Sequence, residues 1–357
     1  MCDVPSGSII LKYNAEVYLL VYVLLPIIIL YKSKIQIINK EYLGRNNTDV
    51  WKGIFIFFVI LGHVTQRMAD PGFVLPLRIA GLLGVSGFLF LSGYGLSVSY
   101  LRKKDFFDRF LLRRLSRVWY PYIVINLIVL CVGAFWWQEN WKFADWLFYG
   151  FGLKMIDGTM WFINATLILY VGFYFSFKYF SKREAVLLLC SYTIMYWGIC
   201  FVMNLGDWWF NSIFTFPLGV IVAIKYKVIE EYNKKIIKMK YYLPLLGILV
   251  IILGGTIGGS HLLALSTAGI LIRTVESMIV PVIVMMLALK IQLLSPIMAF
   301  IGGLSFEIYL VHMKILYVYF QNVEGHSILA YMLFVFTAAM ILKWVINLIS
   351  KYIFRGV

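Results

Sequence analysis

The stretch Asp49-Val-Trp-Lys-Gly-Ile-Phe-Ile-Phe-Phe-Val-Ile-Leu-Gly-His63 is an apolar run, about long enough to enter a bilayer, with ionisable residues at both ends. Ionisable side chains are costly in hydrocarbon, so the terminal histidine is a candidate functional residue. Lys52 and His63 are eleven positions apart. On an ideal helix this is almost a whole number of turns, so both side chains share one face, about 16 Å apart along the axis. They could therefore contact the two ends of one long ligand.

The composition is that of a membrane protein with many spans. Hydrophobic residues make up 62% of the chain and charged residues only 14%, against roughly 25% charged residues in soluble domains. Eleven apolar segments, separated by short loops, cover residues 8–31, 50–65, 77–100, 118–136, 159–180, 185–203, 207–224, 242–259, 262–289, 296–320 and 328–350. We therefore expect an all-α fold, a polytopic membrane helix bundle of about eleven transmembrane helices in a lipid bilayer.

The net charge of +15 is unevenly distributed over the loops. If the loops alternate between the two sides of the membrane, 24 of the 32 basic residues fall on one side. Such an excess marks the cytoplasmic side. It predicts an N-terminus outside the cell and a C-terminus in the cytoplasm. The excess of basic residues thus reflects membrane topology, and we expect no nucleic-acid partner.

Two segments carry polar patterns with more than one interpretation. The segment Ile79–Tyr100 contains five glycines, which indicate either close helix packing or a broken helix that lines a pocket. Arg113, Arg114 and Arg117 follow it, interleaved with apolar residues. They predict either an interfacial helix on anionic lipid or a clamp for phosphate groups.

Several charges lie inside apolar segments. Glu307 has Lys314 seven residues further on, and an acid at such a position indicates either a structural helix–helix pair or part of a site. Arg273 and Glu276, three residues apart, predict a buried ion pair. The four histidines are scattered and no acid-rich loop accompanies them, so we expect no metal site.

Four separate stretches carry a resemblance to a known family. They are Asp49-Val-Trp-Lys52-Gly53…Gly62-His63, Gly87-Phe-Leu-Phe-Leu-Ser92-Gly93-Tyr94, Arg113-Arg114-Leu-Ser-Arg117-Val-Trp-Tyr-Pro121 and Ser305-Phe-Glu-Ile-Tyr309-Leu-Val-His312. Trp161-Phe162 is a weaker fifth match. In this order they resemble acyltransferase family 3 of integral membrane proteins, although Lys52 stands where the family usually has arginine. The resemblance implies an N-terminal transmembrane helix with a cytoplasmic linker over residues 1–44 and a ten-helix membrane acyltransferase domain over residues 45–357.

Members of this family transfer acyl groups, mostly acetyl, to hydroxyls of cell-surface glycans and related molecules. The resemblance implies an O-acetyltransferase of a bacterial inner membrane, with acetyl-CoA or another acyl-CoA as cytoplasmic donor and a glycan or lipid-linked glycan as acceptor. His63 is then the catalytic base or a transient acyl carrier. The implied site comprises catalytic His63, Asp49 and Glu307, cofactor-binding Lys52, Arg113, Arg114 and Arg117, and substrate-binding Ser92, Tyr94, Trp161, Tyr309 and His312.

The alternative function is that of a transporter or flippase for lipid-linked glycans. Its support is the number of spans together with four charges inside them, Arg273, Glu276, Glu307 and Lys314. The spacing from Lys52 to His63 and the arginine stretch favour the enzyme, because they suit a long phosphorylated donor. The sequence leaves the identity of the acceptor open.

Overall fold

The computed structural model describes residues 11, 14–238, 242–263, 266–322 and 326–353, and these are mostly helical. The helices longer than one or two turns are α3 (Arg45–Arg67), α4 (Ala80–Arg102), α5 (Phe110–Trp136), α6 (Phe143–Gly150), α7 (Trp161–Tyr179), α8 (Lys182–Val202), α9 (Thr215–Ile224), α10 (Tyr226–Lys238), α11 (Tyr242–Leu262), α12 (Thr267–Lys290), α13 (Pro296–Gly303), α14 (Ser305–Asn322) and α15 (Ile328–Ile353). Short elements are α1 (Asn14–Tyr18), η1 (Leu19–Leu24), α2 (Leu25–Leu30), η2 (Gly72–Ile79), η3 (Gly158–Met160) and η4 (Asp207–Trp209). Two strands, β1 (Lys34–Ile35) and β2 (Ile291–Gln292), pair antiparallel and attach the N-terminal linker to the end of α12.

Seven helices within these residues are long and apolar enough to cross a membrane, or eight if the bent pair α13–α14 counts as one span. Three further apolar helices are shorter, namely Asn14–Leu30, Thr215–Ile224 and Tyr242–Gly255. The prediction of an all-α polytopic bundle is confirmed. Each of the eleven predicted segments corresponds to one of these helices, but the three short ones fall below the length expected of a full span.

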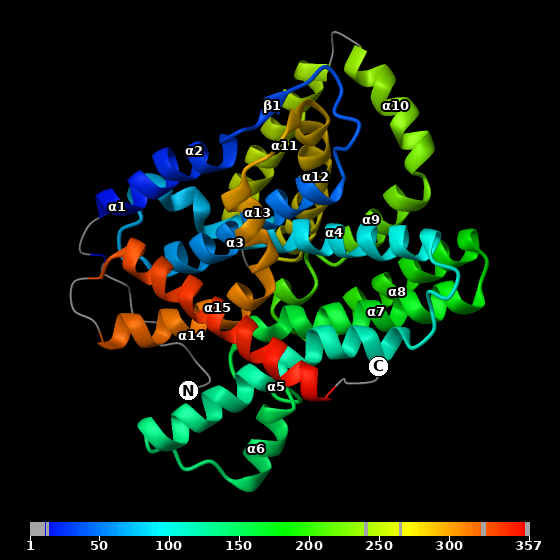
Figure 1. Ribbon diagram of the computed structural model, residues 1–357. Coiled ribbons are helices and arrows are strands. Elements are labelled where there is room, and N and C mark those ends of the chain that lie inside the picture. The colour runs from blue at the N-terminus through cyan, green and yellow to red at the C-terminus, as the bar shows by residue number, and fades with distance from the viewer. Residues whose placement is uncertain (1–10, 12–13, 239–241, 264–265, 323–325, 354–357) are drawn as a thin grey trace.

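Helix α3 forms the centre of the bundle. In its apolar window 72% of the residues are buried, and α4 and α13 both pack along it. Figure 1 shows α3 and α13 side by side in the middle of the molecule, with α6 at one edge and α10 at the opposite one. The central position of α3 buries most side chains between Val50 and Gly62, whereas Asp49, Lys52 and His63 are only partly buried.

Glycines allow the central helices to approach closely. A Cβ added at Gly302 of α13 would lie 1.8 Å from the Asp49 carbonyl oxygen of α3, and one at Gly93 of α4 would lie 2.1 Å from the Phe216 carbonyl oxygen of α9. Such contacts are typical of helix pairs in membranes, where small residues let backbones meet. Because α4 runs without interruption from Ala80 to Arg102, the broken-helix interpretation of this segment is wrong. Three of its glycines, Gly84, Gly87 and Gly93, serve close packing.

The break occurs instead between α13 and α14. The two helices are bent by 74° at Leu304, directly after Gly302 and Gly303. Lys343 Nζ donates a hydrogen bond of 2.5 Å to the Gly303 carbonyl oxygen, a backbone acceptor near the end of α13. The fourth sequence motif begins directly after the bend. It therefore lies in α14, a helix separate from α13.

Candidate functional site

His63 lies in the last turns of α3 and lines a cavity of about 510 Å³, whose wall combines charged and amide side chains with apolar ones. The end of the bundle where α3 ends and α4 begins is called here the histidine end, and the end where α3 begins and α4 ends is called the basic end. The other walls of the cavity come from η2, the start of α4, residues 157–161, residues 207–212, α12 and α14. His63 therefore faces an internal space and not lipid.

His312 of α14 lies beside His63. The two ring centroids are 5.4 Å apart, and His312 is completely buried. Its Nδ1 lies 2.7 Å from the Tyr309 carbonyl oxygen. A carbonyl only accepts, so Nδ1 carries the hydrogen and Nε2 presents a lone pair. Among the described residues this Nε2 is buried and has no hydrogen-bond partner.

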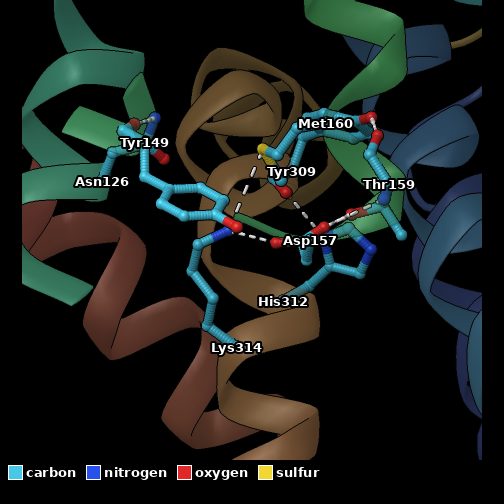
Figure 2. Close-up of polar contacts among 8 residues, drawn as sticks. All are labelled: Asn126, Tyr149, Asp157, Thr159, Met160, Tyr309, His312 and Lys314. Atoms are coloured by element: carbon cyan, nitrogen blue, oxygen red, sulfur yellow. Dashed lines mark hydrogen bonds and ion pairs between the residues drawn. The ribbon is translucent and has the colours of Figure 1, made fainter. Parts of the chain in front are cut away.

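Asp157 fixes the neighbouring loop to α14. One oxygen, Oδ2, lies 2.6 Å from Lys314 Nζ, and Oδ1 accepts hydrogen bonds from the backbone and hydroxyl of Thr159. Burial opposes the charged form of Asp157, but Lys314 and Thr159 outweigh it and hold the pKa of the carboxyl below its ordinary value. Figure 2 shows the Asp157 side chain between Lys314 and Thr159, with the His312 ring beside it. Sequence reasoning identified Lys314 but missed this partner.

Trp161 and Tyr309 complete the wall nearest the histidines. Both line the cavity and both are almost completely buried. The Tyr309 hydroxyl donates to the Thr159 carbonyl oxygen, and its ring packs against Phe162 at 5.3 Å. The structure thus brings together four of the residues that the sequence predicts, from three separate motifs.

A second ion pair lines the same cavity. Arg273 Nε of α12 lies 2.5 Å from Asp207 Oδ2, in the loop after α8. The buried ion pair that the sequence predicts between Arg273 and Glu276 stays a prediction, and Glu276 is completely buried in the same helix. Asp207 carried no sequence signal, because its role depends on a loop folding back over α12.

Asp49 and Lys52 lie at the basic end. Lys52 Nζ donates to Asp49 Oδ1 at 2.8 Å, and Arg45 lies 3.7 Å from the other oxygen of the same carboxylate. Fourteen positions of helix separate Asp49 from His63, which is about 21 Å along the axis. Asp49 therefore positions Lys52 and does not contact the histidine.

Arg113, Arg114 and Arg117 also lie at the basic end, around a small cavity of about 110 Å³. The Arg114 guanidinium lies 6.0 Å from the ring centroid of Tyr170, and burial together with the neighbouring guanidiniums lowers the pKa of Arg114. The Tyr170 hydroxyl is in turn 2.8 Å from the Ser92 hydroxyl. Ser92 is thus linked to the arginine cluster through one tyrosine.

Tyr94 lines a separate cavity of about 450 Å³ at the basic end. Its lining includes three bases, Lys40, Arg45 and Arg102. Glu307 does not line the cavity of His63; it lies in the first turn of α14, next to the bend. Among the described residues, no three His, Cys, Asp or Glu side chains are grouped to hold a metal ion.

The fold and the cavity define a multi-spanning membrane protein with two adjacent imidazoles, one of which lines an internal cavity. Residues 45–348 match the sequence profile of the acyltransferase domain of acyltransferase family 3. The chain belongs to this family, and it is a membrane acyltransferase. No match was found among curated proteins or solved structures.

Proposed function

We propose that the protein transfers an acetyl or another short acyl group from acyl-CoA to a hydroxyl of a glycan, with His63 as the proton acceptor. The observation that carries the proposal is the position of His63 in a cavity with charged and amide groups in its wall, beside a second imidazole whose Nε2 is unpaired among the described residues. Neutral imidazole accepts a proton near pH 7, as general base catalysis requires.

The acceptor enters, in this proposal, from the histidine end. The cavity there combines aromatic side chains with charged and amide groups, and Trp208 at its rim is 54% exposed. A sugar offers both hydroxyls for hydrogen bonds and apolar ring faces for aromatic contacts. The positive-inside pattern of the sequence supports an orientation with this end outside the cell, where cell-surface glycans are found.

The donor binds, in this proposal, at the basic end. Lys52, Arg114 and Arg117 supply cations for the phosphates of acyl-CoA, and the cavity beside Tyr94 offers three more bases. Along α3 the distance from Lys52 to His63 is about 16 Å. An extended donor with its phosphates at the basic end directs its thioester towards the histidines.

The chemical step breaks the thioester C–S bond and forms an ester. His63 takes the proton of the acceptor hydroxyl while its oxygen attacks the acyl carbon, and the sulfur leaves as CoA thiolate, which then takes up a proton. On the competing route His63 attacks first and carries the acyl group until the hydroxyl displaces it. Mass spectrometry of the quenched protein distinguishes the routes, because only the second adds an acyl mass to His63.

The test measures CoA release from acetyl-CoA by the purified protein in lipid nanodiscs, and acetyl content of surface glycans with and without the gene. His63→Ala should abolish both signals, whereas His326→Ala, a histidine outside the cavity, should preserve them. Thermal unfolding of each variant shows that it is folded. An active His63→Ala variant rejects both routes, and a protein that neither binds CoA nor releases it fits the transporter alternative.

A further inference from the structure

Two arginines of the His63 cavity have no acidic partner among the residues that the structure describes. Arg67 ends α3, Arg78 lies in η2, and both line the cavity. Among the described residues, no carboxylate lies within 4.0 Å of either guanidinium. The two carboxylates that share the cavity, Asp157 and Asp207, are already paired with Lys314 and Arg273. Arg67 and Arg78 are therefore the two cations of the cavity wall that are in no ion pair with a described residue.

Backbone contacts hold both side chains in place. Arg67 Nη1 donates to the His63 carbonyl oxygen at 3.0 Å, and Arg78 Nε donates to the Thr65 carbonyl oxygen at 3.4 Å. The Gln66 side chain donates to the Arg78 carbonyl oxygen at 2.7 Å. Both guanidiniums are thus anchored to the last turn of α3, beside the catalytic imidazole.

These contacts stabilise the end of α3, because basic groups favour a helix C-terminus. They use only one N–H group of each guanidinium, which has five. Both Nη groups of Arg78 remain, and together they form the planar fork that binds a carboxylate or a phosphate through two parallel hydrogen bonds. Stabilisation of the end of α3 does not require the two Nη groups of Arg78.

Two partly buried cations without anions are an unfavourable arrangement, because burial costs charged groups hydration that a partner must replace. A ligand with a negative charge removes this cost, and a neutral ligand does not. Arg67 follows His63 by four positions on the same helix, which sets their Cβ atoms about 6 Å apart. A bound anion would thus lie within one or two sugar rings of the hydroxyl at His63.

We propose that the acceptor is an anionic glycan, and that Arg78, with Arg67, binds its carboxylate or phosphate. This inference rests on the proposed function, whose acceptor it narrows to a class. Arg78 is a binding residue in it and His63 remains the catalytic one. The two guanidiniums make the site selective for an anionic acceptor over a neutral one, because a neutral sugar leaves both guanidiniums unpaired.

The experiment compares three probes on the purified full chain in nanodiscs of neutral lipid: methyl glucoside, methyl glucuronide and methyl glucoside 6-phosphate. Binding is measured by calorimetry for wild type, Arg78→Gln and Arg78→Lys. Arg183→Gln is the matched control, since it removes one positive charge from an exposed site at the start of α8. Transfer of acetyl to each probe is followed separately by mass spectrometry.

We expect wild type and Arg183→Gln to bind at least one anionic probe at least tenfold more tightly than the neutral one. Arg78→Gln should remove this preference while leaving the affinity for the neutral probe unchanged, and Arg78→Lys should retain part of it. A preference for the glucuronide indicates a uronic acid, and a preference for the 6-phosphate indicates a phosphorylated sugar. The preference should weaken as salt is raised.

Equal binding of all three probes by the wild type overturns the inference. An Arg78→Gln variant that still prefers the anionic probes also overturns it. So does an Arg78→Gln variant that loses affinity for charged and neutral probes alike. Transfer to the neutral probe at an equal rate also overturns it, and leaves the proposed function intact. Conversely, a charge preference in binding without acyl transfer to any acceptor supports the anion site and rejects the proposed function. The two failures are therefore distinguishable.

Discussion

The imidazole rings of His63 and His312 lie 5.4 Å apart, although they come from motifs at opposite ends of the acyltransferase domain. The Tyr309 carbonyl oxygen fixes the orientation of His312, and the Tyr331 hydroxyl donates to the His312 carbonyl oxygen at 3.0 Å. A fixed imidazole of this kind can orient a substrate or a water molecule beside the general base. The pair therefore functions as one unit in the proposed mechanism.

If the two histidines act as one unit, the effects of removing each one on the rate of acetyl transfer are not additive. His63→Ala and His312→Ala should each lower the rate of acetyl transfer by about 10²–10⁴, the usual contribution of general acid–base catalysis. The double variant should be no slower than His63→Ala alone. The measurement is the initial rate of CoA release at saturating acetyl-CoA. Independent multiplication of the two losses would show that His312 acts on a different step.

The ion pair of Asp157 and Lys314 should contribute strongly to stability. Their side chains are only 11% and 13% exposed, and removing one member of a buried pair leaves the other charge uncompensated, at a cost of about 3–5 kcal/mol. Asp157→Asn should therefore lower the unfolding temperature at pH 7. Asp105→Asn, which changes an exposed acid at the basic end, should leave it unchanged. Replacing both partners by apolar residues should recover much of the loss.

The same carboxylate predicts a pH dependence. The pKa of Asp157 is lower in the folded protein than its ordinary value of 3.8, so its stabilising effect is complete above that value and is lost as pH falls through the folded pKa. The gap in unfolding temperature between wild type and Asp157→Asn should thus be constant from pH 5 to pH 8. It should shrink below about pH 4. A gap that widens on acidification would contradict the assignment of a charged Asp157.

Local features of the site could be predicted from the sequence. The shared face of Lys52 and His63 follows from helical periodicity alone, and the contact of Lys52 with Asp49 joins residues three positions apart. The pairing of Lys314 with Asp157 joins residues 157 positions apart. No periodic pattern encodes such a contact, since it depends on which loop folds over which helix.

The location of the helix break could not be predicted from the sequence either. The segment of α4 contains five glycines and α13 ends on two, and glycine permits a break and close packing alike. What decides between the two is the neighbour that each glycine meets. Gly93 meets the backbone of α9 within an unbroken helix, whereas a Cβ added at Gly303, next to the bend, would meet nothing within 4 Å. Only the tertiary structure contains this information.

Packing of α4 against α9 should depend on Gly93 and not on Gly95. A Cβ at Gly93 would lie 2.1 Å from the Phe216 carbonyl oxygen, whereas at Gly95 nothing lies within 4 Å. Gly93→Ala should therefore force the helices apart and destabilise the protein by about 1–3 kcal/mol. Gly95→Ala should be neutral or stabilise it by up to about 1 kcal/mol, because alanine favours the helix. Unfolding temperatures in one detergent compare the two, and equal losses would refute the packing interpretation.

Binding of the donor should depend on the bases around the small cavity at the basic end. Arg117 shares one helix face with Arg113 and lines that cavity, and a hydrogen bond to a charged group is worth about 1.5–3 kcal/mol. Arg117→Gln should thus weaken CoA binding by about ten- to a hundredfold, and more so at low salt. Lys182→Gln, an exposed base of α8, should bind CoA as wild type does. Calorimetric titration with CoA measures both. An unchanged affinity in Arg117→Gln would place the donor phosphates elsewhere, with the cavity beside Tyr94 as the next site to test by Arg102→Gln.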